Sequence, residues 1–156
     1  KISRQRLGGD SMAFEKNAVL AAHKLIKKYN TSDPYELAKK CGYILLYADL
    51  GDINYAQRDY YKRINVITLN SRSNESLQYY SLAHEIGHAV LHHGFSTAFF
   101  RQSGGCGMVN WAEKDANEFA MQIMLARFSD EDVKRMTKYE LIESMGLQEN
   151  LVRYIQ

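Results

Sequence analysis

Two histidines four residues apart have the residue type and spacing of a metal site. His84 and His88 enclose Glu-Ile-Gly, and on a helix two side chains at this spacing lie on the same face. Two imidazole nitrogens on one helical face can bind zinc, and a catalytic zinc keeps one coordination position for water. Glu85, next to the first histidine, can accept a proton from that water as it attacks a carbonyl carbon. The pattern predicts a zinc-dependent hydrolase with Glu85 as its base.

The residues around this motif predict a helix at about residues 75–93. On a helical wheel one side is apolar, and the two histidines lie nearly opposite to it. The apolar side consists of Tyr79, Leu82, Ala83, Ile86 and Val90. Two solvent-facing histidines beside a solvated glutamate would need the same arrangement by coincidence. The separation of a core side from a histidine side therefore favours a metal site.

A third protein ligand is expected further along the chain, because two histidines alone make an incomplete site. A second long helix, predicted at about residues 111–127, offers Glu113 as that ligand. Asn117 shares the helical face of Glu113 and would orient a ligand histidine through a hydrogen bond. Ala116 and Ala120 lie close to this face, and their small side chains would let the two helices approach closely.

Two further carboxylates on the second helix compete for the role of third ligand. Asp115 and Glu118 are near Glu113 in the sequence but lie on other helical faces. A solvated helix surface explains both, so we expect them to be exposed and not to bind the metal.

Two separated motifs give the sequence its resemblance to a known family. His84-Glu85-x-x-His88, continued by Leu91-His92, and the later Glu113-x-x-Ala116-Asn117-x-Phe119-Ala120 resemble the ImmA/IrrE metallopeptidases. The resemblance extends over about residues 12–127. It implies that the two histidines and the later glutamate hold zinc, and that Glu85 is the catalytic base. Many relatives have a proline after the second motif, where this chain has Leu125-Ala126-Arg127.

The same resemblance implies a biological role. Members of this family are typically encoded on mobile elements or in stress-response loci, where they cleave a helix-turn-helix repressor and release transcription. The first hypothesis is therefore a zinc endopeptidase with such a repressor as its protein substrate. The alternative is an anti-repressor module that contains the metal but inactivates the repressor by binding it, without proteolysis. A general peptidase is a third possibility, less compatible with so small a chain.

Several other residues near the motif have more than one interpretation. His92 follows His88 by one helical turn and could contact the metal, but a histidine that faces solvent or packs locally fits as well. Hydrolysis also needs a group that stabilises the oxyanion, and the sequence does not choose among the candidates. These are Tyr79, Tyr80, His93 and Tyr139. Cys106, in a predicted loop at 94–110, could displace the catalytic water or sense oxidants, although an ordinary free cysteine explains it equally well.

The elements that must position these residues predict a single α+β domain. Helices are expected at 12–30 and 34–42, followed by three strands at 43–47, 53–60 and 64–69. A hairpin turn at 61–63 favours a small antiparallel sheet, whose edge could bind an extended peptide. The rest is helical: after the two long helices come shorter ones, which begin at Ser129 and at a capping box on Thr137.

The composition excludes several other classes of protein. Of the 156 residues 46% are hydrophobic and 24% charged, as is usual in soluble globular domains. A formal net charge of +2 with scattered basic residues argues against direct nucleic-acid binding. We see neither a secretory signal nor a run that could span a membrane, and therefore expect a cytoplasmic protein with reduced cysteines. Met12 could be the natural start, so we interpret 1–11 as a tail or an added segment and 12–156 as the metallopeptidase domain. The oligomeric state stays open.

Overall fold

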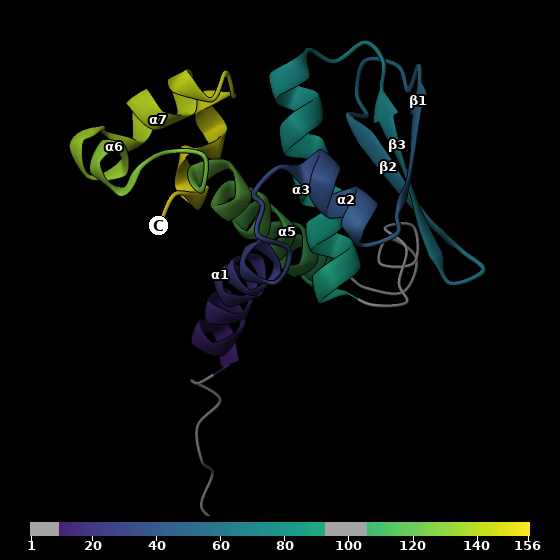
Figure 1. The fold of residues 1–156 in the computed structure, drawn as a ribbon, viewed down its shortest axis with the longest axis horizontal. Helices are drawn as coiled ribbons and strands as arrows, with labels where there is room; N and C mark the ends of the chain where they lie inside the picture. Colours follow the sequence, from purple (N-terminus) through teal and green to yellow (C-terminus); the bar gives the residue numbers. More distant parts are fainter. Residues whose placement is uncertain (1–9, 93–105) are drawn as a thin grey trace, which may run out of the picture.

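The protein has the predicted α+β architecture, with helices before and after a small sheet (Figure 1). A computed structural model describes the backbone of residues 10–92 and 106–156, and the side chains of residues 18–92 and 111–156. His93, most of the loop predicted at 94–110 and most of the segment predicted as a tail lie outside these ranges.

Two helices open the described chain. Helix α1 is Asp10–Tyr29 and helix α2 is Pro34–Lys40. Asp33 caps α2, because its carboxylate accepts a hydrogen bond at 2.9 Å from the backbone N–H two residues later, and Pro34 occupies the first turn. The chain leaves α2 through Gly42, whose φ of 73° is a left-handed conformation that suits glycine.

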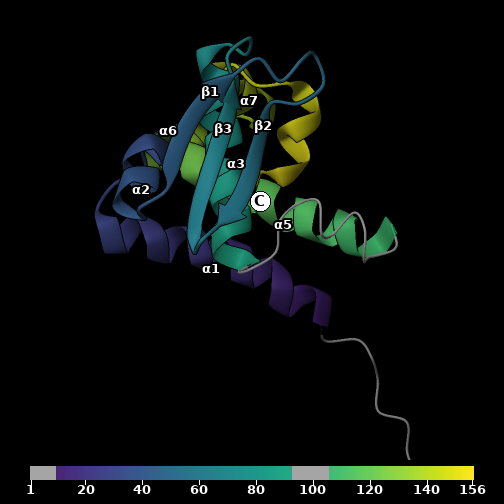
Figure 2. The same ribbon diagram turned by 90° about the vertical axis from the view of Figure 1, so that its right-hand side faces the viewer.

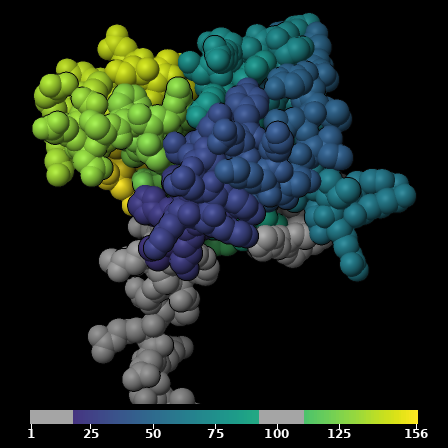
Figure 3. All heavy atoms as spheres, viewed as in Figure 1, coloured from purple at the N-terminus to yellow at the C-terminus, as the bar shows by residue number. Residues whose placement is uncertain are grey.

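The three strands form a mixed sheet. They are β1 (Ile44–Ala48), β2 (Ala56–Tyr61) and β3 (Ile64–Asn70). β2 and β3 make the predicted antiparallel hairpin, closed at Lys62 and Arg63, which both have positive φ. The hairpin tip projects from the body of the molecule (Figure 3).

The prediction of a wholly antiparallel sheet is wrong, because β1 and β3 run parallel. The strand order is β1-β3-β2, and Figure 2 shows β3 between the other two strands. The loop after β1 carries the chain past the position next to β1, so β2 forms the other edge of the sheet. β3 then returns into the gap between them, antiparallel to β2 and hence in the direction of β1.

Two long helices follow the sheet and contact each other. Helix α3 is Glu75–Leu91, and helix α5 is Cys106–Leu125. α5 begins at Cys106, so this residue is helical and does not belong to a loop as predicted. Gly107 was interpreted as a loop residue, and the helix includes it. The chemistry suggested for Cys106 remains untested, because its side chain is not among those described.

The contact between α3 and α5 is close because small residues lie within it. Ala116 and Ala120 of α5 are fully buried, which agrees with their predicted place in the contact. On α3, Gly87 lies so near α5 that a Cβ there would be 3.1 Å from Phe119 Cδ1. The sheet packs against α3, and α1 packs against α5 (Figures 1 and 2). The two long helices therefore form the centre of the domain.

The C-terminal part folds back onto this centre. It consists of α6 (Asp130–Arg135), α7 (Lys138–Ser144) and a 3-10 helix, η1 (Glu149–Tyr154). Ser129 and Thr137 cap the first two, and Thr137 forms the predicted capping box with Glu140. η1 contacts both α7 and α5. No helix within residues 10–92 and 106–156 is long and apolar enough to cross a membrane.

Candidate metal centre

Three side chains from α3 and α5 converge on one point. His84 and His88 project from successive turns of α3, and their Nε2 atoms are 3.1 Å apart. Glu113 of α5 faces both histidines. Its Oε2 lies 3.3 Å from His84 Nε2, and its Oε1 lies 3.2 Å from His88 Nε2. Each residue offers one atom within 4.8 Å of the others, so these three could hold a metal ion.

The spacing of these atoms fits a zinc ion. Two ligands that are each about 2.05 Å from zinc, at a tetrahedral angle, lie about 3.3 Å apart. The distances of 3.1, 3.2 and 3.3 Å between the three side chains are close to this value. Two imidazoles and one carboxylate are also a donor set of catalytic zinc sites, in which the fourth position takes water or substrate.

The electrostatics of the cluster suit a cation. Burial alone would raise the pKa of Glu113, but hydrogen bonds from His84 and His88 outweigh it and hold the pKa far below its ordinary value. At His84 burial would lower the pKa, but the hydrogen bonds to Glu113 and Asn117 and the charges of Glu85 and Glu113 together outweigh burial, so the pKa is raised. An ionised carboxylate therefore faces the two imidazole rings.

Asn117 lies one helical turn after Glu113 and contacts His84. Its Oδ1 is 3.1 Å from His84 Nδ1, the ring nitrogen that faces away from Glu113. An acceptor at this place keeps a proton on Nδ1 and leaves the lone pair of Nε2 for a metal. Two tyrosines contact the same amide: Tyr80 Oη at 2.7 Å from Oδ1 and Tyr154 Oη at 3.3 Å from Nδ2. Neither tyrosine was connected with Asn117 from the sequence.

Glu85 is buried beside this cluster, with 7% of its surface exposed. Within the described part of the chain, its Oε2 atom has no hydrogen-bond partner. Arg58 of β2 is buried nearby; burial lowers its pKa, and the negative charge of Glu85 opposes that shift. Arg58 Nη1 also donates to Asn65 Oδ1 at 2.9 Å. Arg58 was not recognised from the sequence, because one arginine in a polar strand carries no recognisable signal.

The cluster opens into a cleft of about 630 Å³. His84, Glu85, Glu113 and Asn117 line one side of it. The loop before β2 and the first residues of β2, together 53–59, line another side, and the C-terminal part contributes Gln148, Asn150 and Leu151. The cleft therefore lies between the two long helices, the sheet edge and η1.

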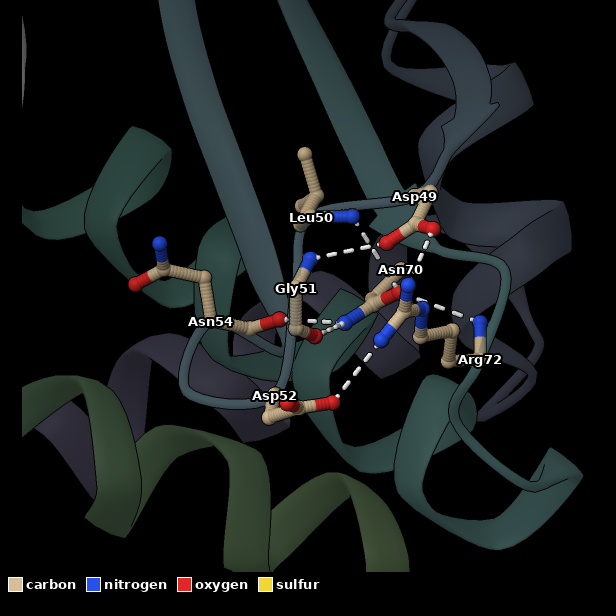
Figure 4. Close-up of polar contacts among 7 residues, drawn as sticks. All are labelled: Asp49, Leu50, Gly51, Asp52, Asn54, Asn70 and Arg72. Atoms are coloured by element: carbon tan, nitrogen blue, oxygen red, sulfur yellow. Dashed lines mark hydrogen bonds and ion pairs between the residues drawn. The ribbon is translucent and has the colours of Figure 1, made fainter.

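A buried asparagine binds the backbone of the loop that forms one cleft wall. Asn70, at the end of β3, uses its whole amide group on this loop and its own turn (Figure 4). Its Nδ2 donates to the carbonyl oxygens of Gly51 and Asn54, both at 2.7 Å. Its Oδ1 accepts from the backbone N–H of Leu50 at 3.3 Å and of Arg72 at 3.0 Å. The backbone of the wall is thereby attached to the end of β3.

The two carboxylates that compete with Glu113 are buried, contrary to the prediction. Asp115 and Glu118 were expected on a solvated helix surface, but each is only 4% exposed. The prediction is wrong because α5 is covered by α1, α3 and η1, so that more than its ligand face is buried. Neither residue belongs to the group of three possible ligands found among the described residues.

His92 and the tyrosines suggested as oxyanion-stabilising groups lie in different surroundings. His92 is 5% exposed and packs between the rings of His88 and Trp111, whose centroids are 5.7 and 5.1 Å from its own. Of the two interpretations of a histidine without a metal role, local packing is confirmed and exposure to solvent is wrong. Of the tyrosines proposed for the oxyanion, Tyr80 lines the cleft. Tyr79 instead lies under the guanidinium group of Arg127, and Tyr139 is 59% exposed on α7.

Two comparisons with known proteins give the family of this chain. Residues 38–151 match the model of the peptidase M78 family, described as the IrrE N-terminal-like domain. The chain is also 35% identical over 105 residues to a protein of Bacillus phage phi105 named "Uncharacterized immunity region protein 2". That match covers 67% of this chain and 66% of the phage protein, slightly less than two thirds of its length. The chain belongs to the peptidase M78 family, a family of metallopeptidases, as the resemblance of its two motifs implied.

Proposed function

We propose that the protein is a zinc-dependent endopeptidase that cleaves a helix-turn-helix transcriptional repressor of a mobile element or stress locus. The observation that carries the proposal is the convergence of His84, His88 and Glu113 beside a cleft that is lined by His84, Glu113 and Glu85. Membership of a metallopeptidase family supports the reaction, and a relative from a phage immunity region supports a repressor as the substrate. Such a substrate acts on the chromosome, so we place the reaction in the cytoplasm.

His84, His88 and Glu113 would hold the zinc ion. When bound, zinc supplies the Lewis acidity that polarises a scissile carbonyl group and acidifies a water molecule. Glu85 takes a proton from the attacking water and passes it to the leaving amine. Glu85 lines the same cleft as the ligands His84 and Glu113, which supports this role. Asn117 keeps the proton of His84 on Nδ1 and thereby orients the ring.

The cleft also has a wall that suits a polypeptide substrate. In the described sheet β2 is an edge strand, and residues 56–59 of this strand line the cleft. An edge strand offers backbone N–H and C=O groups to an extended peptide, which can pair with it as an added strand. A peptide bond held there would lie beside the three ligands and Glu85. This arrangement favours cleavage within an extended segment of a protein.

The alternative is a metal-containing anti-repressor that binds its target without cutting it. Both functions predict bound zinc, and they differ in the need for Glu85. We would purify the wild type and Glu85→Gln, measure zinc content, and incubate each with a proteome-derived peptide library and a panel of purified helix-turn-helix repressors.

For the peptidase we expect about one zinc per chain in both proteins. Cleavage by Glu85→Gln should be slower by about 100-fold or more, because general acid–base catalysis is lost. A Glu85→Gln variant that relieves repression as well as the wild type in a reporter strain would support the anti-repressor instead. A wild type that takes up no zinc on titration would refute the zinc peptidase.

A further inference from the structure

Three segments that are far apart in the sequence meet at the amide group of Asn117. Tyr80 of α3 places its hydroxyl oxygen 2.7 Å from Asn117 Oδ1, the same atom that His84 Nδ1 approaches at 3.1 Å. Tyr154, the last residue of η1, places its hydroxyl oxygen 3.3 Å from Asn117 Nδ2. Tyr154 lies beyond residues 38–151, the range that matches the family model.

The direction of these hydrogen bonds determines which nitrogen of His84 carries the proton. With Oδ1 toward His84, Nδ1 donates its proton to the amide, and Nε2, which faces His88 and Glu113, is the nitrogen whose lone pair a metal can take. With the amide turned by 180°, the NH2 group would face Nδ1, which would then have to be the acceptor. The proton of a neutral ring would move to Nε2, where it blocks a metal. The orientation of the amide is therefore a condition for metal binding.

Tyr80 supplies the reason for the productive orientation. Its side chain is buried, and burial raises its pKa far above the ordinary value, so it remains a hydroxyl donor. Its described acceptor is Asn117 Oδ1. In the turned amide the NH2 group would also face this hydroxyl, and the buried O–H would lose its acceptor, at a cost of about 1–3 kcal/mol.

Tyr154 completes the network from the other side. Its hydroxyl accepts from Asn117 Nδ2, and because the side chain is only partly buried, its own proton can be directed toward solvent. The Tyr154 hydroxyl is compatible with either amide orientation, so it restrains the position of the amide more than its direction. Its contribution should therefore be smaller than that of Tyr80.

We propose that Tyr80 and Tyr154 are positioning residues of the metal centre, which act through Asn117 on His84, and that η1 is thereby part of this centre. The proposal rests on the proposed zinc site. It predicts a ranked set of zinc affinities, because removal of each hydroxyl disturbs the same amide to a different extent.

The test starts from metal-free protein, which is titrated with zinc at fixed pH in the presence of a chromophoric chelator. The competition gives the dissociation constant of the zinc complex. Loss of a group that orients a ligand typically weakens metal binding by about 10–100-fold, which we expect for Asn117→Ala. We expect a loss of about 10-fold for Tyr80→Phe and about 3-fold for Tyr154→Phe, since both retain the aromatic ring. Tyr139→Phe, the same change at an exposed residue of α7, should bind zinc like the wild type.

A double-mutant cycle separates positioning from general destabilisation. If Tyr80 acts through Asn117, then Tyr80→Phe has no further effect in the Asn117→Ala background. Equal losses in both backgrounds, or zinc binding by Tyr80→Phe as tight as in the wild type, would overturn the proposal. A wild type that binds no zinc would instead refute the proposed function, so the two failures are distinguishable.

Discussion

The two sides of the cleft are held in place by different interactions. On the metal side, ligands from α3 and α5 are positioned by side-chain contacts within a few ångströms, and His88 is only 2% exposed. At the wall formed by the loop before β2, the side chain of Asn70 binds the backbone of the loop. Its side chains are free to face solvent, and Ile53 is 87% exposed.

This difference separates chemistry from recognition. The metal side depends on particular side-chain atoms, so most changes there should alter zinc binding or the reaction. The loop wall depends on the path of its backbone, so exposed side chains such as Ile53 can vary without displacing the ligands. Substitutions that act on one side and spare the other test whether the two are independent.

The largest effect is expected from Glu113→Gln, which changes the charge of a ligand with little change in shape. An ionised carboxylate faces the two imidazoles, and a neutral amide would be a poor substitute for it. We expect zinc affinity to fall by about 100-fold or more. The matched control is Glu131→Gln at an exposed position of α6. Retention of full zinc affinity by Glu113→Gln, measured by chelator competition, would remove Glu113 from the ligand set.

The metal side was largely predictable because helical periodicity converts spacing into proximity. The two histidines, four residues apart, share a face of one helix, and Glu113 and Asn117 share a face of the other. A contact between the two helices was therefore the only further assumption that the predicted site required. Asp115 and Glu118 were misinterpreted for a related reason. A helical wheel shows the faces of a helix but not how many neighbours cover it, and α5 has neighbours on several sides.

A smaller effect is expected from Asn70→Ala, which removes the attachment of the loop wall. Four backbone groups lose their partner (Figure 4), and solvent can replace part of these bonds. We expect a loss of about 2 kcal/mol in the free energy of unfolding, measured with urea. Zinc affinity should be unchanged, whereas KM for peptide cleavage should rise.

The control for Asn70→Ala is Asp52→Ala, which removes the ion pair with Arg72 in the same loop. Both partners are exposed, so stability should hardly change. If Asn70→Ala weakened zinc binding as strongly as Glu113→Gln, the two sides of the cleft would be coupled and the comparison would fail.

The loop wall could not be predicted to the same degree. Caps and strands follow local patterns, and the capping box at Thr137 and the β2–β3 hairpin were recognised from them. The position of β1 depends on where the loop carries the chain, and no local pattern encodes this path. The same holds for Asn70, whose partners extend over residues 50–72, and for Tyr154, which meets Asn117 from 37 residues away.

The smallest effect is expected from Gly87→Ala, which tests how closely α3 and α5 must approach. Alanine favours a helix by about 1 kcal/mol over glycine, so an isolated helix would gain stability. In the protein the new methyl group would lie 3.1 Å from Phe119 Cδ1 and 3.2 Å from Phe119 Cβ, and Phe119 is fully buried. We expect this overlap to outweigh the gain and to give a net loss of about 1 kcal/mol.

Gly87→Ala should also weaken zinc binding by a few-fold, because displacement of α5 moves Glu113 away from the histidines. Combination with Phe119→Leu, which alters the side chain that the methyl group meets, tests this cause. Zinc affinity should recover at least in part in the double variant relative to Gly87→Ala alone. A Gly87→Ala protein that is more stable than the wild type and binds zinc equally well would show that the helix contact yields without moving the ligands. The precision of the metal side would then depend on the hydrogen bonds of Asn117 and not on the packing of the helices.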